Sequence, residues 1–219
     1  MRVLDDGREL MASFDDIDNF FRKNKILGRT IIDIKGAAYD YMIGNLEDLD
    51  DIWNSQCSCG IETDSQVCII FEDGDNMEVE FIGDGPKILG FNTAKFENYP
   101  KEDGSCYTLH TMFEKALGKK IVDIRFEKTE FHMSFSAYNG IDMSAEDDGI
   151  DHIEFVLSDD TVLRAGGWLD FYSFEHKNLN GEDIYVPFRN LLIELNRKTV
   201  DRIFADDGPE YYNSKAAEK

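Results

Sequence analysis

Residues 27–34 read LGRTIIDI, and residues 117–124 read LGKKIVDI. A fainter version, LNRKTVDR, stands at residues 195–202. Self-similarity of this kind indicates that one supersecondary unit is used more than once. We therefore expect an internally duplicated chain with a partial third repeat, rather than a scaffold built around one catalytic cleft.

The flanking residues predict a helix followed by a strand in each main copy. Ser13 is suited to cap a helix, and apolar residues then recur at helical spacing up to Gly28. A stripe of the same spacing precedes Gly118. Glycine favours the left-handed position just past a helix end because it has no Cβ to clash. Strands are predicted next, over residues 30–34 and 120–125.

Each copy continues with a polar insert, a hairpin and a further strand. Turn residues Asp73-Gly74 and Asp159-Asp160 separate apolar runs, which predicts two β-hairpins. Further strands are predicted at residues 87–91 and 169–174. The inserts between first strand and hairpin look irregular. The expected class is α+β: a repeated helix-strand-insert-hairpin-strand unit, with mostly antiparallel sheets and helices on one face.

This pattern divides the chain into four parts. We expect a first half at residues 1–92, a packed connector at 93–106, a second half at 107–183, and a partial third repeat with a frayed tail at 184–219. The connector contains Phe96 and Tyr99, so a free linker is not expected.

The charge is strongly acidic: 45 Asp and Glu stand against 23 Lys and Arg, giving a formal net charge of -22. The chain is also 42% hydrophobic and 12% aromatic, so the charge belongs to a folded body rather than a disordered tail. Such a charge serves solubility or presents a field to a basic partner. It disfavours direct binding to nucleic acid. The amino terminus resembles no signal peptide and no apolar run is long enough to span a bilayer, so we expect a cytoplasmic protein without membrane contact.

Signatures of catalysis are absent from the sequence. It contains no phosphate-binding glycine loop, no dinucleotide fingerprint, no His-Glu-x-x-His and no nucleophile elbow. Cys57, Cys59 and Cys68 match zinc spacing poorly, and Cys106 with His110 lacks a third orienting group. The carboxylate clusters do not fit a calcium loop. We expect reduced thiols, no metal, no cofactor and no enzyme activity.

Two acidic inserts and one aromatic segment are candidate contact surfaces, although core packing is an alternative for the apolar part of the first insert and for the aromatic segment. The candidate partner-binding residues are Glu47, Asp48, Asp50, Asp51 and Trp53 in the first insert, Glu146, Asp147, Asp148 and Asp151 in the second, and Trp168 at the start of an aromatic run.

In its charge, its size and its lack of catalytic motifs, the chain resembles the immunity proteins of bacterial toxin systems, including those of contact-dependent growth inhibition. The resemblance implies a non-enzymatic inhibitor that binds a cognate basic toxin or nuclease domain and blocks its active or substrate-binding surface. Two alternatives stay open: a nucleic-acid mimic that inhibits a defence nuclease, and a carboxylate- or metal-dependent hydrolase.

Overall fold

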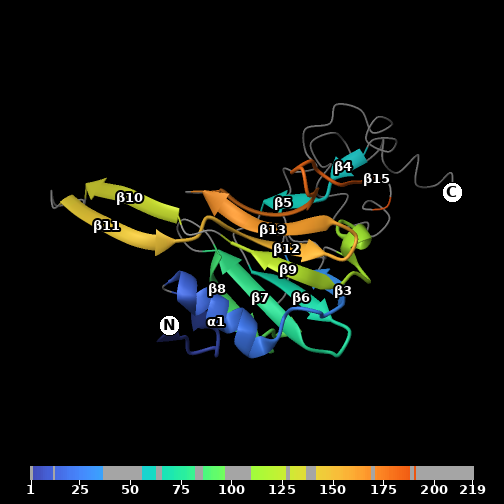
Figure 1. Cartoon of the computed structure of the whole chain (residues 1–219), viewed down its shortest axis with the longest axis horizontal. Helices are drawn as coiled ribbons and strands as arrows, with labels where there is room; N and C mark the ends of the chain where they lie inside the picture. The colour runs from blue at the N-terminus through green and yellow to red at the C-terminus, as the bar shows by residue number, and fades with distance from the viewer. Residues whose placement is uncertain are drawn as a thin grey trace, which may run out of the picture.

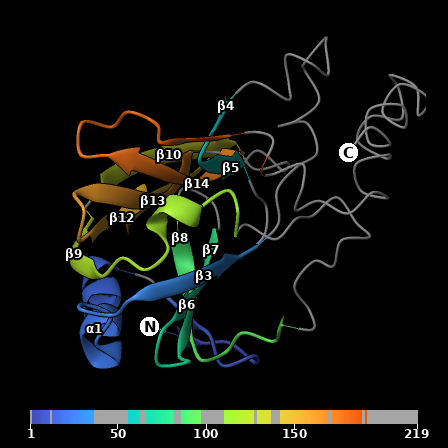
Figure 2. The ribbon, with the colours of Figure 1, turned by 90° about the vertical axis from the view of Figure 1, so that its right-hand side faces the viewer.

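The computed structural model describes residues 2–11, 13–36, 56–62, 66–81, 86–96, 110–126, 129–136, 142–168, 171–187 and 190. Within these residues, antiparallel strands dominate and there is one α-helix, α1 (Phe14–Asn24). Figure 1 and Figure 2 show two stacked sheets with α1 beside them. The predicted mixture of helix and antiparallel sheet is therefore confirmed.

The first sheet contains, among the described residues, six strands in the order β1-β2-β8-β7-β6-β3. Their bounds are β1 Arg2–Val3, β2 Glu9–Leu10, β3 Ile31–Lys35, β6 Val67–Phe71, β7 Asn76–Phe81 and β8 Pro86–Phe91. The hairpin predicted around Asp73-Gly74 is β6–β7, and Gly74 has φ 89° in its turn. This positive φ explains why glycine stands there.

The second sheet contains, in the described part of the chain, five strands in the order β5-β14-β13-β12-β9. Their bounds are β5 Gly60–Glu62, β9 Ile121–Arg125, β12 His152–Leu157, β13 Thr161–Trp168 and β14 Phe171–Asn178. Two small sheets pair β4 (Gln56–Ser58) with β15 (Tyr185–Pro187), and β10 (Thr129–Ser136) with β11 (Asp142–Gly149). Because β5 joins β14, the chain after β3 contributes a strand to the second sheet before it returns to the first.

Four strands follow one another in the same order in both sheets: β3-β6-β7-β8 in the first and β9-β12-β13-β14 in the second. Ile31 lies opposite Phe71, and Ile121 lies opposite Leu157. In both pairs the register shifts directly after that position. The two hairpins therefore attach to their first strands with the same irregularity.

The two sheets meet where the copies of the repeated peptide cross. The Gly28 N–H donates to the Ile121 carbonyl at 2.8 Å, and the Gly118 N–H donates to the Ile31 carbonyl at 2.7 Å. The N–H groups of Ile31 and Ile121 bond the opposite segment in the same reciprocal way, at 2.9 and 3.0 Å. Exchanging the two segments reproduces each bond, so the crossing has a local two-fold arrangement.

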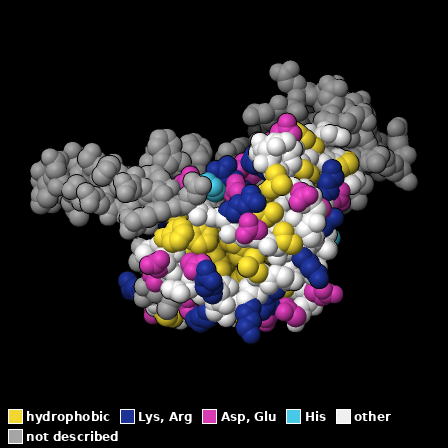
Figure 3. Space-filling model, viewed as in Figure 1, with side chains coloured by type: hydrophobic (Ala, Val, Ile, Leu, Met, Phe, Trp, Pro, Cys, Tyr) yellow, Lys and Arg dark blue, Asp and Glu magenta, His cyan; other side chains and the backbone are white. Residues whose placement is uncertain are grey.

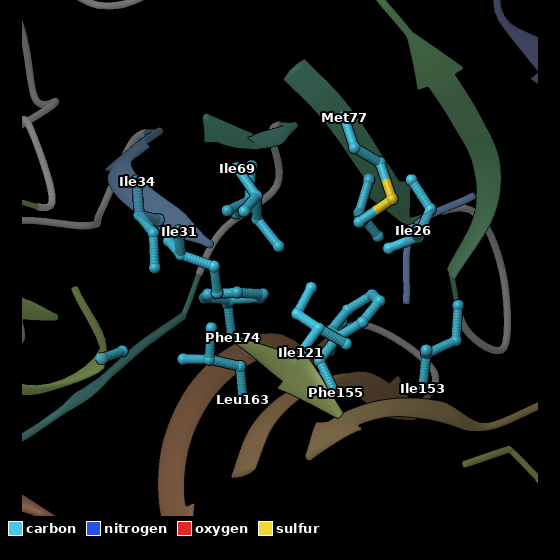
Figure 4. Close-up of a cluster of buried hydrophobic side chains, with 14 of the residues drawn as sticks. Ile26, Ile31, Ile34, Ile69, Met77, Ile121, Ile153, Phe155, Leu163 and Phe174 are labelled. Atoms are coloured by element: carbon cyan, nitrogen blue, oxygen red, sulfur yellow. The ribbon is translucent and has the colours of Figure 1, made fainter. Parts of the chain in front are cut away.

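The hydrophobic core fills the space between the sheets (Figure 4). Ile31, Ile69 and Met77 come from the first sheet, and Ile121, Phe155, Leu163 and Phe174 come from the second; all are fully buried. Burying one such side chain is worth roughly 1.5–3 kcal/mol. The apolar positions of both sheets thus stabilise the same layer.

Helix α1 begins as predicted, because Ser13 Oγ accepts a hydrogen bond from the Asp16 N–H at 3.3 Å. Its end differs from the prediction. The helix stops at Asn24, and Lys25 takes the left-handed cap with φ 51°. Gly28 has φ 88°, but it serves the crossing rather than the helix end.

Side chains of α1 contact both sheets. Phe21 packs edge-on against Phe155 of β12, with ring centroids 5.8 Å apart. Lys23 pairs with Glu9 of β2 at 2.5 Å. Since α1 reaches both sheets in this way, a layer of helices on one sheet face stays a prediction.

The α-helix predicted before Gly118 is wrong within the described residues. Residues 110–118 form turns and the short 3-10 helix η3 (Glu114–Ala116). Phe113 and Ala116 are nevertheless buried, and the Phe113 ring lies 5.2 Å from that of Phe174. The apolar spacing therefore predicted correctly that Phe113 and Ala116 are buried. The stretch between residue 109 and Gly118 is short for an α-helix, because the first helical turn is unfavourable to form. The third copy at residues 195–202 lies outside the described residues.

In the described part of the chain, no helix has the length and apolar character that a membrane crossing requires.

The crossing predicts a specific sensitivity at its glycines. Gly28 and Gly118 have φ 88° and 77°, and a Cβ at either would meet nothing within 4 Å. Val at either position should therefore lower the free energy of unfolding by about 1 kcal/mol or more through backbone strain alone. Asn at the same positions is the matched control and should cost much less, since Asn tolerates left-handed backbone. Urea unfolding measures both; equal losses for Val and Asn would contradict the strain argument.

Candidate partner-binding surface

The predicted contact residues separate into two groups in the structure. The first insert, with Glu47, Asp48, Asp50, Asp51 and Trp53, lies outside the described residues. The second group is placed: Glu146, Asp147 and Asp148 lie on β11, Asp151 follows that strand, and Trp168 is the last residue of β13.

The second insert is a regular hairpin, and the irregular segment predicted there is wrong. β10 and β11 pair over eight positions, from Thr129 opposite Gly149 to Ser136 opposite Asp142. Figure 1 shows the two strands extending from one end of the stacked sheets. We call β10 and β11 together the arm. Phe131, Met133 and Phe135 alternate with polar residues, and this period of two was the signal that could have predicted the strand.

The strands of the arm carry acids without basic residues. Glu130, Asp142, Glu146, Asp147 and Asp148 lie on β10 and β11, which contain no Lys or Arg. In the register, Glu130 stands directly opposite Asp148. Like charges at opposed positions destabilise a strand pair. The acids therefore do not serve the stability of the arm itself.

The base of the arm holds a small polar cluster. Asp151 Oδ1 lies 2.7 Å from His152 Nδ1, although the two atoms are not aligned for a hydrogen bond. His152 Nε2 is 3.9 Å from Glu154 Oε1. His152 stands opposite Gly166, two residues before Trp168. The end of β13 and the base of the arm thus lie at the same end of the second sheet.

Aromatic side chains lie close to that base. Phe126 follows β9 and precedes the arm; its ring centroid is 4.7 Å from that of Phe14 and 5.9 Å from that of Phe21. Phe14 and Phe126 are only partly buried. Figure 3 shows hydrophobic side chains gathered above α1 on this face. Sequence reasoning missed Phe126, because only the fold brings it to α1.

Cys57 is half-buried, and Cys59 and Cys68 are buried. Burial raises the pKa of Cys57 to about 11 and that of Cys59 to about 12. Cys57, Cys59 and Cys68 are free thiols. Among the described residues, no group of three or more His, Cys, Asp or Glu is arranged to hold a metal ion. Cys106 lies outside the described residues, and His110 pairs with Asp33 at 3.0 Å.

A small polar pocket of about 90 Å³ lies on the first sheet, lined by Asp6, Arg8, Gln66, Glu78, Thr93 and Lys95. Arg8 is bound by Asp6 at 2.6 Å and also by Glu80. Thr93 Oγ1 donates to Glu78 Oε2 at 2.5 Å, and Glu78 is buried. These contacts tie the β1–β2 turn to the sheet, and the guanidinium of Arg8 is already occupied by carboxylates.

His176 of β14 is a buried histidine that contacts the first residue of β13. Thr161 Oγ1 lies 2.7 Å from Asp159 Oδ1 and 2.8 Å from His176 Nε2. Burial alone would raise the pKa of Asp159, but hydrogen bonds from Thr161 and Lys119 hold it below its usual value. Asp159 is therefore ionised and accepts a hydrogen bond from the Thr161 hydroxyl. The Thr161 oxygen must then accept a hydrogen bond from the Nε2–H of His176. Burial lowers the pKa of His176 to about 4, and its Nδ1 has no hydrogen-bond partner among the described residues.

Comparisons of the chain with protein families, with curated proteins and with solved structures found no match.

The buried imidazole predicts an acid-sensitive fold. An unfolded histidine takes up a proton near pH 6.5, whereas His176 resists protonation until about pH 4. Stability is therefore fully present above pH 6.5 and falls as pH drops to 4, by about 3 kcal/mol from this residue. His176→Gln should remove that part of the slope. Urea unfolding at several pH values measures it; parallel curves for variant and wild type would contradict the assignment.

Proposed function

We propose that this chain is a non-enzymatic acidic binding protein of the immunity type, which neutralises a basic toxin or nuclease domain in the cytoplasm. It does so by covering the active or substrate-binding surface of that partner. The observation that carries the proposal is the formal net charge of -22 on a folded body. A field of this size steers a basic protein into encounter and repels nucleic acid.

The use of basic side chains supports this proposal. Several cations of the described body are shared between two carboxylates each: Arg8 with Asp6 and Glu80, Arg29 with Asp73 and Asp75, and Lys177 with Glu175 and Asp183. A cation held in this way is not available to a phosphate. Figure 3 shows both signs interspersed on one face, so no broad basic surface is presented there.

The place of the acids also supports the proposal. Glu146, Asp147 and Asp148 lie on the arm, outside the two sheets that hold the core. Residues on such extensions can change without cost to a packed scaffold. A charged extension on a rigid body is a suitable contact element for a partner.

We further propose that the scaffold is an internal duplication. The shared strand order, the matching register shifts and the reciprocal crossing support this. On this view, the insert after β3, with Glu47 to Asp51, and the arm after β9 occupy equivalent places, and both contribute contacts.

Capture with the full chain as bait, followed by an inhibition assay, tests the function. The captured protein should be basic, and an equimolar amount of the chain should abolish its toxic or nuclease activity. A partner that keeps its activity in the complex would overturn the immunity-type proposal.

Neutralising the arm should slow association with that partner. The change is Glu146→Gln with Asp147→Asn and Asp148→Asn. We expect the association rate constant to fall about tenfold at low salt, because steering weakens as acids are removed. The rate for wild type should also fall as salt rises, since salt screens the field. Stopped-flow mixing at several salt concentrations measures both effects.

The matched control removes three charges elsewhere, by Asp5→Asn, Glu72→Gln and Asp160→Asn. These residues are exposed and lie on turns of the body. The control should change the rate less than threefold, and both variants should keep the thermal midpoint of wild type. If both variants slow association equally, the arm is not part of the contact. If the association rate does not depend on salt, the net charge serves solubility only. The quadruple change E47Q, D48N, D50N and D51N applies the same test to the first insert.

A further inference from the structure

The arm is amphipathic across its width. Successive residues of a strand alternate between the two faces of a sheet, and directly paired residues share a face. With Phe131 opposite Asp147, Met133 opposite Ala145 and Phe135 opposite Met143, these positions fall on one face. We call it the apolar face, since Asp147 is the only charged residue in these three pairs. The other face carries Glu130, Asp142, Glu146 and Asp148, with His132 and serines between them.

The arm forms a two-stranded sheet of its own in the described part of the chain. Among the described strands, β10 pairs only with β11. Figure 1 shows both strands beyond the stacked sheets, with no other described element alongside. A two-stranded ribbon is at best marginally stable in water unless one face packs against something. The arm therefore has the pattern of a strand pair that completes its packing on another molecule.

The charges of the arm distinguish between the molecules that could cover it. A second copy of the chain would bring together two arms with five acids each and no Lys or Arg on either pair of strands. Opposed like charges at an interface are strongly unfavourable. A basic partner reverses this balance, because Arg pairs with carboxylates in two-bond geometry and stacks on aromatic rings.

We propose that the arm inserts into a groove of the basic partner, with its apolar face on an apolar floor and its acidic face against Lys and Arg of the wall. This inference rests on the proposed function and names the part of the chain that enters the partner. The paired strands are eight residues long, about 26 Å at the usual rise of a strand. A groove of that length is expected of a protein that handles an extended polymer.

Site-specific photocrosslinking in the source cells tests the insertion. A benzophenone amino acid is placed in the full chain at Met133, at the neighbouring Ser134, or at Ile32, which is 45% exposed on β3. Met133 and Ser134 are matched positions on opposite faces of one strand. We expect Met133 to give at least five times more adduct than Ile32, and the adduct to contain a basic protein. An adduct with a second copy of the chain, a preference for Ile32, or no adduct at Met133 overturns the insertion.

Affinity measurements with the basic protein that crosslinking identifies test the apolar face. Phe131→Ser with Phe135→Ser should weaken binding tenfold or more. The control, Val3→Ser with Leu179→Ser, changes two exposed apolar side chains of the body and should stay within threefold. Both variants should keep the thermal midpoint, because the arm lies outside the two main sheets and the control residues are exposed. If both variants bind and neutralise like wild type, the insertion falls and the proposed function stands. If the protein that crosslinks to position 133 keeps its activity in the complex, the proposed function falls while the arm remains an interface.

Discussion

The structure depends on the reciprocal hydrogen bonding between the two copies of the repeated peptide. Gly28 and Gly118 each donate to the opposite segment, and both have positive φ, which lets the chain turn directly into a strand. The crossing places Ile31 and Ile121 in the core and starts β3 and β9 in different sheets. A charged side chain reinforces it on each side. Arg29 bonds Asp73 and Asp75 in the turn of one hairpin, and Lys119 pairs with Asp159 in the turn of the other, at 3.1 Å.

The acidic arm is separate from this crossing. Each hairpin adds to its own first strand, and the strands of the arm pair with neither main sheet among the described strands. The arm is paired only with itself among the described strands, so its hydrogen bonding is separate from that of the two main sheets. Contact residues that lie outside a packed scaffold can change without cost to that scaffold. The proposed immunity-type function uses this separation, with affinity placed in the arm and stability in the crossing.

Local patterns predicted the parts of the fold that local chemistry determines. The strands after Gly28 and Gly118 and the hairpins at Asp73 and Asp159 follow from residue alternation and turn residues. The helix before Gly118 failed because apolar spacing reports burial, and burial alone did not supply a helical nucleus. Pairing of β5 with β14 and the contact of Arg8 with Glu80 join residues far apart in sequence, and no short-range pattern marks them. The acids of β11 were found from composition, but their place on a paired strand needed the register with β10.

Hydrogen exchange of the full chain, alone and bound to the basic protein that it captures, tests the central claim most directly. If the arm enters the partner, amides of Thr129–Ser136 and Asp142–Gly149 should gain protection on binding, because a marginal strand pair becomes packed. Amides of β6 and β7, which lie in the core of the first sheet, should be protected equally in both states. Unchanged exchange in the arm, with new protection confined to the two main sheets, would contradict the account.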